Sequence, residues 1–263
     1  MRLFVCETDP DKNGKIVVDG DSFKHFRAIR AEVGDIVRVR LLSGEEAQST
    51  ISILDKKNQR LILQLCATSP SAGEGNALKE IWLFQFVPKS TKFDQIVRQA
   101  TECGVLRIFP VVSEFSRDGA QRTDFRFERF ERIIREAIQQ SGSSVKTRVE
   151  HSVCVNDVCK IWQDEIQKND GREKRALVFW EKNEKTVPLS SQLDKKIDLC
   201  AIAVGSEGGI SNAEIDSLCN AGFVPVHLKT NILRCETAAL YALALFKMRL
   251  NCKNRPIRIW RYF

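Results

Sequence analysis

The most constraining feature of this sequence is an alternation of strand-like and helix-like segments that begins near residue 81. Residues 81–87 form a continuous apolar run of strand length, and Phe93, Ile96 and Ala100 then share one helical face. Similar apolar runs recur at residues 105–112, 176–180, 199–204 and 223–228. Buried strands that alternate with amphipathic helices predict an α/β fold with a parallel sheet, because parallel neighbours need a crossover connection.

The first 70 residues follow a different pattern. Short runs with period-two alternation, such as residues 35–41 and 60–65, are separated by turn signals and predict a small, mostly antiparallel sheet or barrel. One helix, residues 21–32, is expected to interrupt it. The small, polar segment 69–76 is a linker candidate. We therefore expect two domains, residues 1–72 and 77–263.

The composition is that of a globular protein, with 43% hydrophobic and 29% charged residues. The apolar stretch 238–246 is far shorter than the roughly 20 residues that a membrane-spanning helix needs. The N-terminus runs into acidic residues at Glu7 and Asp9 and lacks the apolar core of a signal peptide. These observations predict a cytoplasmic protein without a membrane segment.

The cysteines and histidines do not form a recognisable site. There are nine cysteines, an odd number, with no Cys-x-x-Cys pair, and the histidines at 25, 151 and 227 are scattered. A disulfide framework or a metal site is therefore not expected.

Most of the net charge of +7 lies near the C-terminus. Between Lys247 and Phe263 the chain carries six basic residues and no acidic one, interleaved with Trp260 and Tyr262. Cations and aromatic rings in one segment suit contact with the phosphates and bases of a nucleic acid. A solvated tail is the alternative interpretation.

Two turns, each between an expected strand and an expected helix, are the strongest indication of function. Residues 205–209 read Gly-Ser-Glu-Gly-Gly and lead into a capping box at 211–214, and residues 231–238 follow the strand 223–228. Glycine lets backbone amides approach a ligand closely, and two turns at neighbouring strand ends can form one cofactor site. The first turn matches no common nucleotide-binding motif, so a tight turn without a ligand is the alternative.

The helix after the second turn is apolar on nearly every side between Thr237 and Leu245. Such a helix is expected to be buried all round. Burial against a second subunit is one interpretation, and packing within the chain is the other.

These turns and three further segments resemble the motifs of one family. The family is that of the ribosomal RNA small subunit methyltransferase E, which acts on uridine N3. Its motif G-P-E-G-G-[FIL]-[ST]-x-x-E is similar to residues 205–210 with Glu214. Its motif I-L-R-x-E-T-A is similar to residues 232–238. Three further motifs of the family also have counterparts here. K-A-T-E-L-G-V resembles residues 99–105, E-A-x-x-Q-S-G resembles residues 136–142, and H-x-x-x-V-L-R-x-x-x-G-D resembles residues 25–35. The resemblance spans residues from about 1 to 250 in the same order.

The resemblance implies an N-terminal PUA-like β-barrel that binds RNA and a C-terminal SPOUT α/β domain with a deep trefoil knot. It implies S-adenosylmethionine as the cofactor and small-subunit (16S) ribosomal RNA, free or assembled in the 30S subunit, as the substrate. It also implies a homodimer in which the partner subunit completes each site, with no metal and no membrane.

The resemblance also assigns roles to residues. Arg234 is expected to favour the ionised uracil, unless it pairs with Glu207 or Glu236, and Glu207 is the second catalytic candidate. The cofactor is expected to contact Val204, Gly205, Glu207, Gly208, Leu228, Asn231, Ile232, Leu233 and Thr237. RNA contacts are expected from His25, Arg27, Arg30, Arg117 and Arg148.

Three positions depart from the family pattern. Ser206 replaces the proline of the first motif, Lys229 replaces a glycine before I-L-R, and Ser143 stands where arginine often follows Q-S-G. The last two departures motivate an alternative function, that of a knotted RNA-binding protein without catalysis. A methyltransferase of the same fold that acts on another RNA acceptor is the third interpretation.

Overall fold

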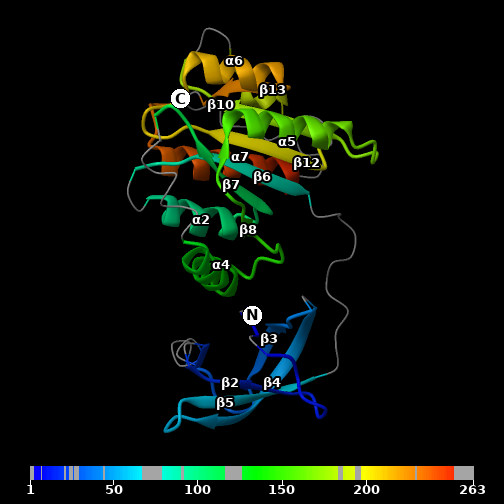
Figure 1. The fold of residues 1–263 in the computed structure, drawn as a ribbon. Coiled ribbons are helices and arrows are strands. Elements are labelled where there is room, and N and C mark those ends of the chain that lie inside the picture. Colours follow the sequence, from blue (N-terminus) through cyan, green and yellow to red (C-terminus); the bar gives the residue numbers. More distant parts are fainter. Residues whose placement is uncertain are drawn as a thin grey trace, which may run out of the picture. The chain divides into compact units, whose positions relative to one another are not determined.

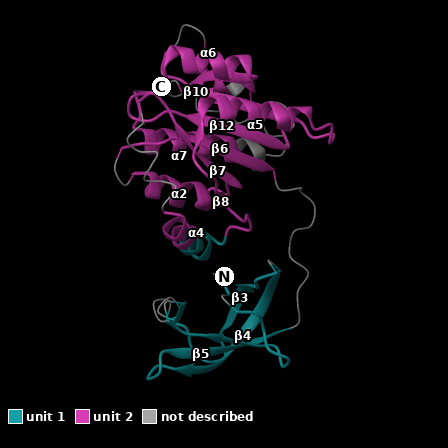
Figure 2. Ribbon diagram, in the orientation of Figure 1, with its two compact units in different colours: residues 1–76, 135–142 teal, residues 77–134, 143–263 magenta. Residues whose placement is uncertain are grey.

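The computed structural model of the 263-residue chain forms two compact units (Figure 2). Residues 1–76 and 135–142 make up unit 1, and residues 77–134 and 143–263 make up unit 2. The structure describes residues 3–6, 8–20, 22–23, 26, 30–43, 45–66, 79–89, 92–115, 126–182, 186–192, 197–228 and 230–251.

Unit 1 is built on a five-stranded sheet. In sheet order the strands are β1 (Leu3–Val5), β3 (Ile36–Arg40), β4 (Glu46–Asp55), β5 (Arg60–Leu65) and β2 (Lys15–Val18). β1 pairs with β3 in parallel, and the other three pairs are antiparallel. Alternate residues, among them Val39, Ile51 and Leu63, are fully buried in one apolar cluster. The sheet is mostly antiparallel, as the alternation predicts, whereas much of the expected helix 21–32 lies outside the described residues.

Unit 2 contains a parallel sheet in the order β11-β13-β10-β12-β6-β7-β8, with β9 also paired to β7 (Figure 1). Its strands are β6 (Glu80–Phe86), β7 (Arg107–Val112), β8 (Arg148–Val149), β9 (Val153–Cys154), β10 (Lys174–Phe179), β11 (Val187–Pro188), β12 (Leu199–Val204) and β13 (Phe223–His227). Every residue of β12 is buried, which explains why this strand is apolar throughout. The α/β fold with a parallel sheet is confirmed.

Helices cover both faces of this sheet (Figure 1). α5 (Val155–Gln167) and α6 (Asn212–Asn220) pack on one face through a cluster that includes Trp162 of α5 and Ile215 of α6. α2 (Lys92–Glu102) and α7 (Cys235–Asn251) contact each other and lie on the opposite side. α4 (Phe127–Ser141) packs on α2 through the rings of Phe130 and Phe93, and the 3-10 helix η2 (Leu189–Gln192) follows β11.

Helix α5 is not indicated by the sequence signals used above. It begins after Cys154, whose backbone N–H donates to the carboxylate of Asp157 at 3.2 Å. A helix start is usually indicated by serine, threonine, aspartate or asparagine. A cysteine at this position therefore does not predict a helix.

Helix α7 is not buried all round within the chain. Ala239 and Ala242 are buried, but Tyr241 is 40% exposed and Met248 is 56% exposed. With the exposed Ala244, these two residues form a stripe at helical spacing, here called the α7 stripe. Packing within the chain does not bury this helix on every side, whereas burial against a second subunit stays a prediction.

The basic tail lies mostly outside the described residues, which end at 251. Lys247 belongs to α7 and is partly buried: its Nζ would lie 2.6 Å from a Cβ placed on Gly104. Burial lowers the pKa of Lys247. This lysine is therefore not part of a solvated tail.

Cross-links are not found in the part of the chain that the structure describes. All eight cysteines there are free thiols, and no group of histidine, cysteine, aspartate and glutamate suited to a metal ion occurs among those residues. Among the same residues, no helix has the length and apolar character needed to cross a membrane.

We expect Phe84→Ala to lower the free energy of unfolding by about 3–5 kcal/mol, because truncating a buried ring leaves a cavity. Phe84 of β6 is fully buried and stacks on Phe109 of β7 with ring centroids 4.5 Å apart. Denaturant unfolding followed by circular dichroism measures the change. Ile166→Ala, at a 48% exposed position of α5, is the control and should cost less than about 1 kcal/mol. Equal losses in the two variants would contradict this description of the core.

Candidate functional site

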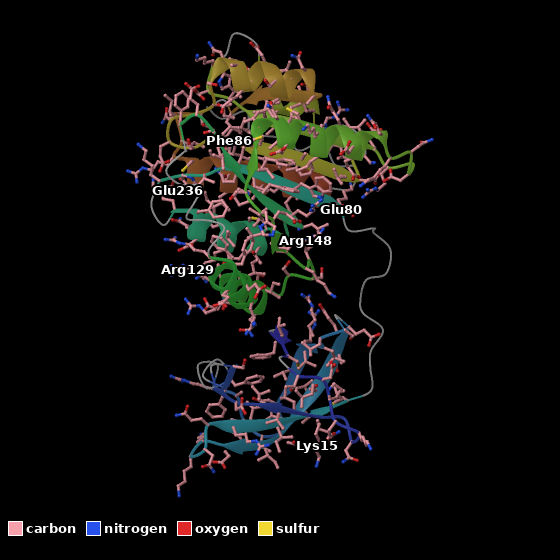
Figure 3. All side chains as sticks on the ribbon, in the orientation of Figure 1. Lys15, Glu80, Phe86, Arg129, Arg148 and Glu236 are labelled. Atoms are coloured by element: carbon pink, nitrogen blue, oxygen red, sulfur yellow. The ribbon has the colours of Figure 1, made fainter. Side chains whose placement is uncertain are left out.

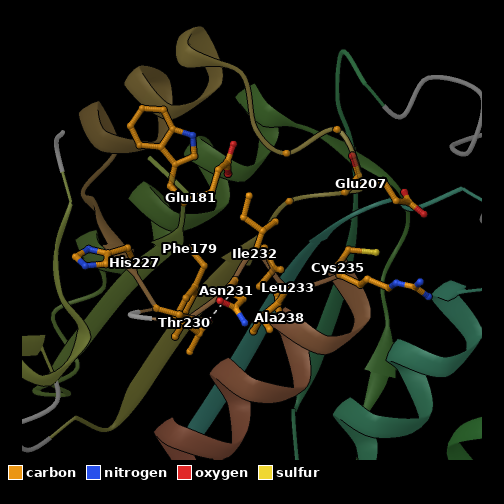
Figure 4. A pocket seen from close by; sticks show the side chains of 18 of the residues that line it. Phe179, Glu181, Glu207, His227, Thr230, Asn231, Ile232, Leu233, Cys235 and Ala238 are labelled. Carbon is orange, nitrogen blue, oxygen red and sulfur yellow. Dashed lines mark hydrogen bonds between the residues drawn. The ribbon is translucent and has the colours of Figure 1, made fainter. Parts of the chain in front are cut away.

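Three neighbouring strands of unit 2 end at the same edge of the sheet. β10 lies between β13 and β12, and its last residue, Phe179, is in register with Val226 on one side and Val204 on the other. The loops that follow parallel strands share an edge, so these three loops converge. They border a cavity of about 570 Å³ (Figure 4), a size that suits a small-molecule ligand.

The cavity combines segments from distant parts of the chain. The loop after β12 forms one wall, the loop after β13 forms another, and the end of β10 lies between them, with α2 and α7 at the side. The lining residues are Lys92, 179–181, 204–209, His227, Leu228, 230–235 and Ala238.

Glycines determine the shape of the loop after β12. A Cβ on Gly205 would lie 3.0 Å from the carbonyl carbon of Gly209, and a Cβ on Gly208 would lie 2.8 Å from the Cβ of Phe115. Gly209 has a φ of +74°, a conformation that favours glycine. The packing of the loop itself thus requires these glycines. They do not distinguish a tight turn from a binding site, whereas the cavity that the loop borders favours the site.

A cluster of ionised groups joins three segments beside the cavity. The Nζ of Lys92 in α2 lies 2.9 Å from Oε1 of Glu207 in the loop after β12 and 3.7 Å from Oε2 of Glu236 in α7, which Figure 3 labels. Glu207 also accepts a hydrogen bond from the backbone N–H of Lys89 at 3.0 Å. Lys92 therefore ties the glycine-rich loop and the start of α7 to α2.

The cluster shifts the pKa values of its members. The hydrogen bond to Glu207 raises the pKa of Lys92. Partial burial alone would raise the pKa of Glu207, but hydrogen bonds from Lys89 and Lys92 lower it. Burial and the hydrogen bond to Glu236 raise the pKa of Cys235 to about 12, so this thiol stays protonated at neutral pH. The cluster thus holds a cation between carboxylates, and Cys235 is no nucleophile there.

The loop after β13 presents two exposed side chains. Ile232 is 90% exposed (Figure 4), and Arg234 is exposed directly before α7. The guanidinium of Arg234 makes no hydrogen bond or ion pair with the described residues. Among the described residues, Lys92 is the ion-pair partner of both Glu207 and Glu236, and Arg234 interacts with Glu236 only through the longer-range attraction between their charges.

Comparison with known proteins identifies the family. Residues 75–247 match the model of the RNA methyltransferase domain family. The ribosomal RNA small subunit methyltransferase E of Aquifex aeolicus (strain VF5) is 32% identical over 248 residues, which cover 93% of this chain and 98% of that protein. The chain belongs to the ribosomal RNA small subunit methyltransferase E family.

Solved structures of similar proteins have the same fold. The methyltransferase E of Neisseria gonorrhoeae, bound to S-adenosylmethionine, aligns with a TM-score of 0.70 at 21% identity and covers 94% of this chain and 97% of its own. A Legionella pneumophila protein, solved in complex with the bound cofactor SAM, aligns with a TM-score of 0.71 at 19% identity, over 94% and 96% of the two chains. At these identities the likeness establishes the fold.

The methyltransferase E motifs supply much of the cavity lining. Of the residues predicted to bind the cofactor or to act in catalysis, Thr237 does not line the cavity and is exposed on α7. The others all line it: Val204, Gly205, Glu207, Gly208, Leu228, Asn231, Ile232, Leu233 and Arg234.

Of the residues predicted to bind RNA, the two that the structure describes, Arg30 and Arg148, do not line the cavity. His25, Arg27 and Arg117 lie outside the described residues. Arg30 is exposed in unit 1, with a φ of +54°. Arg148 of β8 lies in unit 2 (Figure 3); its side chain is 63% exposed and its Nε lies 2.8 Å from Glu150.

The three departures from the methyltransferase E pattern have different surroundings. Ser206 lines the cavity and is buried, and its Oγ has no hydrogen-bond partner among the described residues. The Oγ of Ser143 accepts the backbone N–H of Val145 at 3.3 Å, so it shapes a local turn. Lys229 lies outside the described residues, although its neighbours Leu228 and Thr230 line the cavity.

Sequence reasoning missed Lys92 and the end of β10 as parts of this site. Phe179, Trp180 and Glu181 line the cavity because β10 lies between β12 and β13. Their position after an expected strand was the available signal. The order of strands in the sheet, which decides whether that end joins the site, is not contained in the local pattern.

We expect Lys92→Met to destabilise the protein at neutral pH, with a difference from the wild type that shrinks in acid. The pKa of Glu207 is lowered below its usual 4.5, so its contribution is present above 4.5 and is lost as the pH falls through the lowered value. Thermal unfolding of both proteins at pH 7 and at about pH 3.5 measures this gap. Lys92→Arg, which keeps the charge, is the control. A gap of equal size at both pH values would mean that Lys92 acts only through packing.

Proposed function

We propose that this chain is an S-adenosylmethionine-dependent methyltransferase that methylates N3 of a uridine in 16S ribosomal RNA and acts in the cytoplasm. The observation that carries the proposal is the cavity at three adjacent strand ends, whose lining is largely made of two family motifs. The name of the Aquifex aeolicus relative supports small-subunit ribosomal RNA as the substrate.

The residues of the cavity fit S-adenosylmethionine. Because the loop after β12 has glycines at 205, 208 and 209, its backbone borders the cavity directly. When bound, the cofactor supplies an electrophilic methyl group on a sulfonium centre. The backbone amides of Gly205, Gly208, Ile232 and Leu233 would hold it, with contacts from Val204, Leu228 and Asn231.

The protein must also align the acceptor base with the methyl group and place a charge beside that base. N3 of uracil carries a proton that must leave, and a cation nearby favours the ionised base. Arg234 lines the cavity, and no ion pair or hydrogen bond with a described residue engages its guanidinium, so we assign this role to it. Glu207 binds Lys92 and the N–H of Lys89, and we assign it the role of holding the glycine-rich loop in place.

N3 lies on the Watson–Crick edge, so the target uridine must be unpaired or flipped out. His25, Arg27, Arg30, Arg117 and Arg148 would contact phosphates and position the RNA. The basic tail supplies further cations. Free ribosomal RNA and the assembled 30S subunit both present a phosphate backbone to these cations.

We further propose that residues 1–72 form a PUA-like β-barrel and residues 77–263 a SPOUT domain with a deep trefoil knot. The mostly antiparallel sheet of unit 1 supports the first assignment. The second is supported by the strand order, because the chain passes from β12 to β13 across β10 and both of these loops line one cavity.

A homodimer is the third part of the proposal. The α7 stripe leaves Tyr241, Ala244 and Met248 exposed on one face of a helix that is otherwise packed against the chain. A second copy of α7 or of its surroundings would cover this apolar surface.

The central experiment incubates the protein with labelled S-adenosylmethionine and 30S subunits from a strain that lacks the enzyme, and identifies the product nucleoside by mass spectrometry. We expect 3-methyluridine. Arg234→Ala should lower the rate about 100-fold, as expected for a lost charge contact to the reacting base, and Arg132→Ala on the exposed face of α4 is the control. A different methylated nucleoside would favour another acceptor. Absence of transfer together with absence of cofactor binding would favour the non-catalytic alternative.

The dimer is tested separately. We expect Tyr241→Glu combined with Met248→Glu to shift the protein toward monomer in sedimentation equilibrium, because charges then replace apolar contacts at an interface. Ile166→Glu, at an exposed apolar position of α5, is the control. A wild-type protein that sediments as a monomer at all concentrations would contradict the dimer.

A further inference from the structure

The side chain of Phe115 is exposed at the same edge of the sheet as the cavity. Phe115 lies shortly after the end of β7 and is 44% exposed. A single exposed apolar side chain is ordinary on a protein surface, so the exposure alone identifies no partner. The position of the ring is more informative.

Phe115 packs on the glycine-rich loop after β12. A Cβ placed on Gly208 would lie 2.8 Å from the Cβ of Phe115, 3.0 Å from its Cγ and 3.4 Å from its Cδ2. Gly208 lines the cavity, whereas Phe115 does not. The ring therefore lies next to a wall of the cavity and outside the cavity itself.

The backbone before the ring is held in place by α6. The N–H of Glu114 donates to Oε1 of Glu214 at 3.2 Å, and Oε2 of Glu214 accepts the N–H of Ser211 at 3.0 Å. Glu214 and Ser211 form the capping box of α6. Phe115 is thus fixed between the start of α6 and the glycine-rich loop. Its exposed face is pre-organised, which lowers the entropy cost of binding a partner.

A cation lies on the same side of the glycine-rich loop. β6 lies between β12 and β7 in the sheet, and Lys89 follows the end of β6. The backbone N–H of Lys89 donates to Oε2 of Glu207 at 3.0 Å, so Lys89 adjoins residue 207 as Phe115 adjoins residue 208. The side chain of Lys89 is exposed. Glu207 has its ion pair with Lys92, so the charge of Lys89 is not neutralised there.

An aromatic ring beside a cation suits a single strand of RNA. Bases of any sequence stack on an aromatic ring, and a lysine contacts the phosphates of the same strand. The proposed reaction gives a reason for such a contact at this place. A uridine that is flipped out to present N3 leaves the stack, and its neighbour then lacks a stacking partner. A ring just outside the cavity can replace that partner.

We propose that Phe115 stacks on a base next to the target uridine and that Lys89 contacts a phosphate of the same strand. This inference rests on the proposed function, in which an unpaired uridine enters the cavity. Neither residue belongs to the motifs that indicated the family, or to the residues predicted from the sequence to bind RNA.

Fluorescence anisotropy of a short labelled oligouridine, in the presence of S-adenosylhomocysteine, tests the contact. We expect Phe115→Leu to weaken binding of this probe about tenfold, because leucine keeps the apolar packing on Gly208 but offers no flat face to a base. Phe115→Tyr keeps that face and should bind the probe nearly as well as the wild type. Phe127→Leu, at a partly exposed ring at the start of α4, is the matched control.

The salt dependence of probe binding separates the two residues. Each phosphate contact to a single strand contributes about 0.7 to the slope of log K against log salt concentration. Lys89→Gln should therefore reduce this slope by about 0.7. Phe115→Leu should leave the slope unchanged, because a stacked base releases no counterions. Lys160→Gln, at an exposed position of α5, is the control.

Several results would overturn the inference. Equal losses in Phe115→Leu and Phe115→Tyr would mean that the aromatic face is not used. A lower melting temperature or a weaker affinity for S-adenosylhomocysteine in Phe115→Leu would mean that the ring only supports the loop. A shift of this variant toward monomer in sedimentation equilibrium would place the ring in a subunit contact. Unchanged probe binding by Phe115→Leu, or no probe binding by the wild type, would overturn it as well.

The proposed function can fail separately. Methyl transfer to 30S subunits by the wild type reports on that function and does not depend on the oligouridine probe. A wild type that transfers no methyl group would refute the proposed function, while a tenfold loss of probe affinity in Phe115→Leu would still establish a stacking contact with RNA. Normal methyl transfer with unchanged probe binding by Phe115→Leu would refute this inference alone.

Discussion

The cavity depends on the register of three parallel strands. Phe179 at the end of β10 is opposite Val204 of β12 and Val226 of β13, so the loops that follow all leave the sheet at one level. A slip of one residue in β12 would exchange its buried faces and move the glycine-rich loop by about 3.3 Å. The apolar packing of both faces of the sheet opposes such a slip. The stability of the core and the geometry of the binding site therefore have the same physical origin.

Local sequence patterns are enough to find most elements of unit 2, but not their neighbours in space. β12 is recognisable because a strand buried on both faces must be apolar at every position. Nothing in the pattern around β10 indicates that it lies between β12 and β13, so Glu181 could not be placed in the cavity beforehand. Helix α5 was missed because Cys154 is an uncommon residue at a helix start. The exposed α7 stripe could not be foreseen either, since uniform apolarity does not say which face the chain covers.

The ion pairs of the site could not be predicted from local sequence patterns either. The sequence offered Glu207 and Glu236 as partners for the nearby Arg234, because these residues share two adjacent motifs. In the structure Lys92 reaches both carboxylates from α2, a helix that contacts α7 although the two are far apart in the chain. The two cations therefore have different roles. Lys92 holds segments together, while the guanidinium of Arg234 makes no hydrogen bond or ion pair with a described residue and interacts with Glu236 only at longer range.

The glycine at 208 has an implication for how this loop can change over time. Its α-carbon packs so closely on Phe115 that an added methyl group would come within 2.8 Å of that residue's Cβ. A larger residue at 208 is therefore tolerated only if the backbone near residue 115 shifts away. If that backbone shifts while residue 208 is still glycine, a gap is left between the two segments. The two positions should vary together or not at all among descendants of this chain, although one follows β7 and the other follows β12.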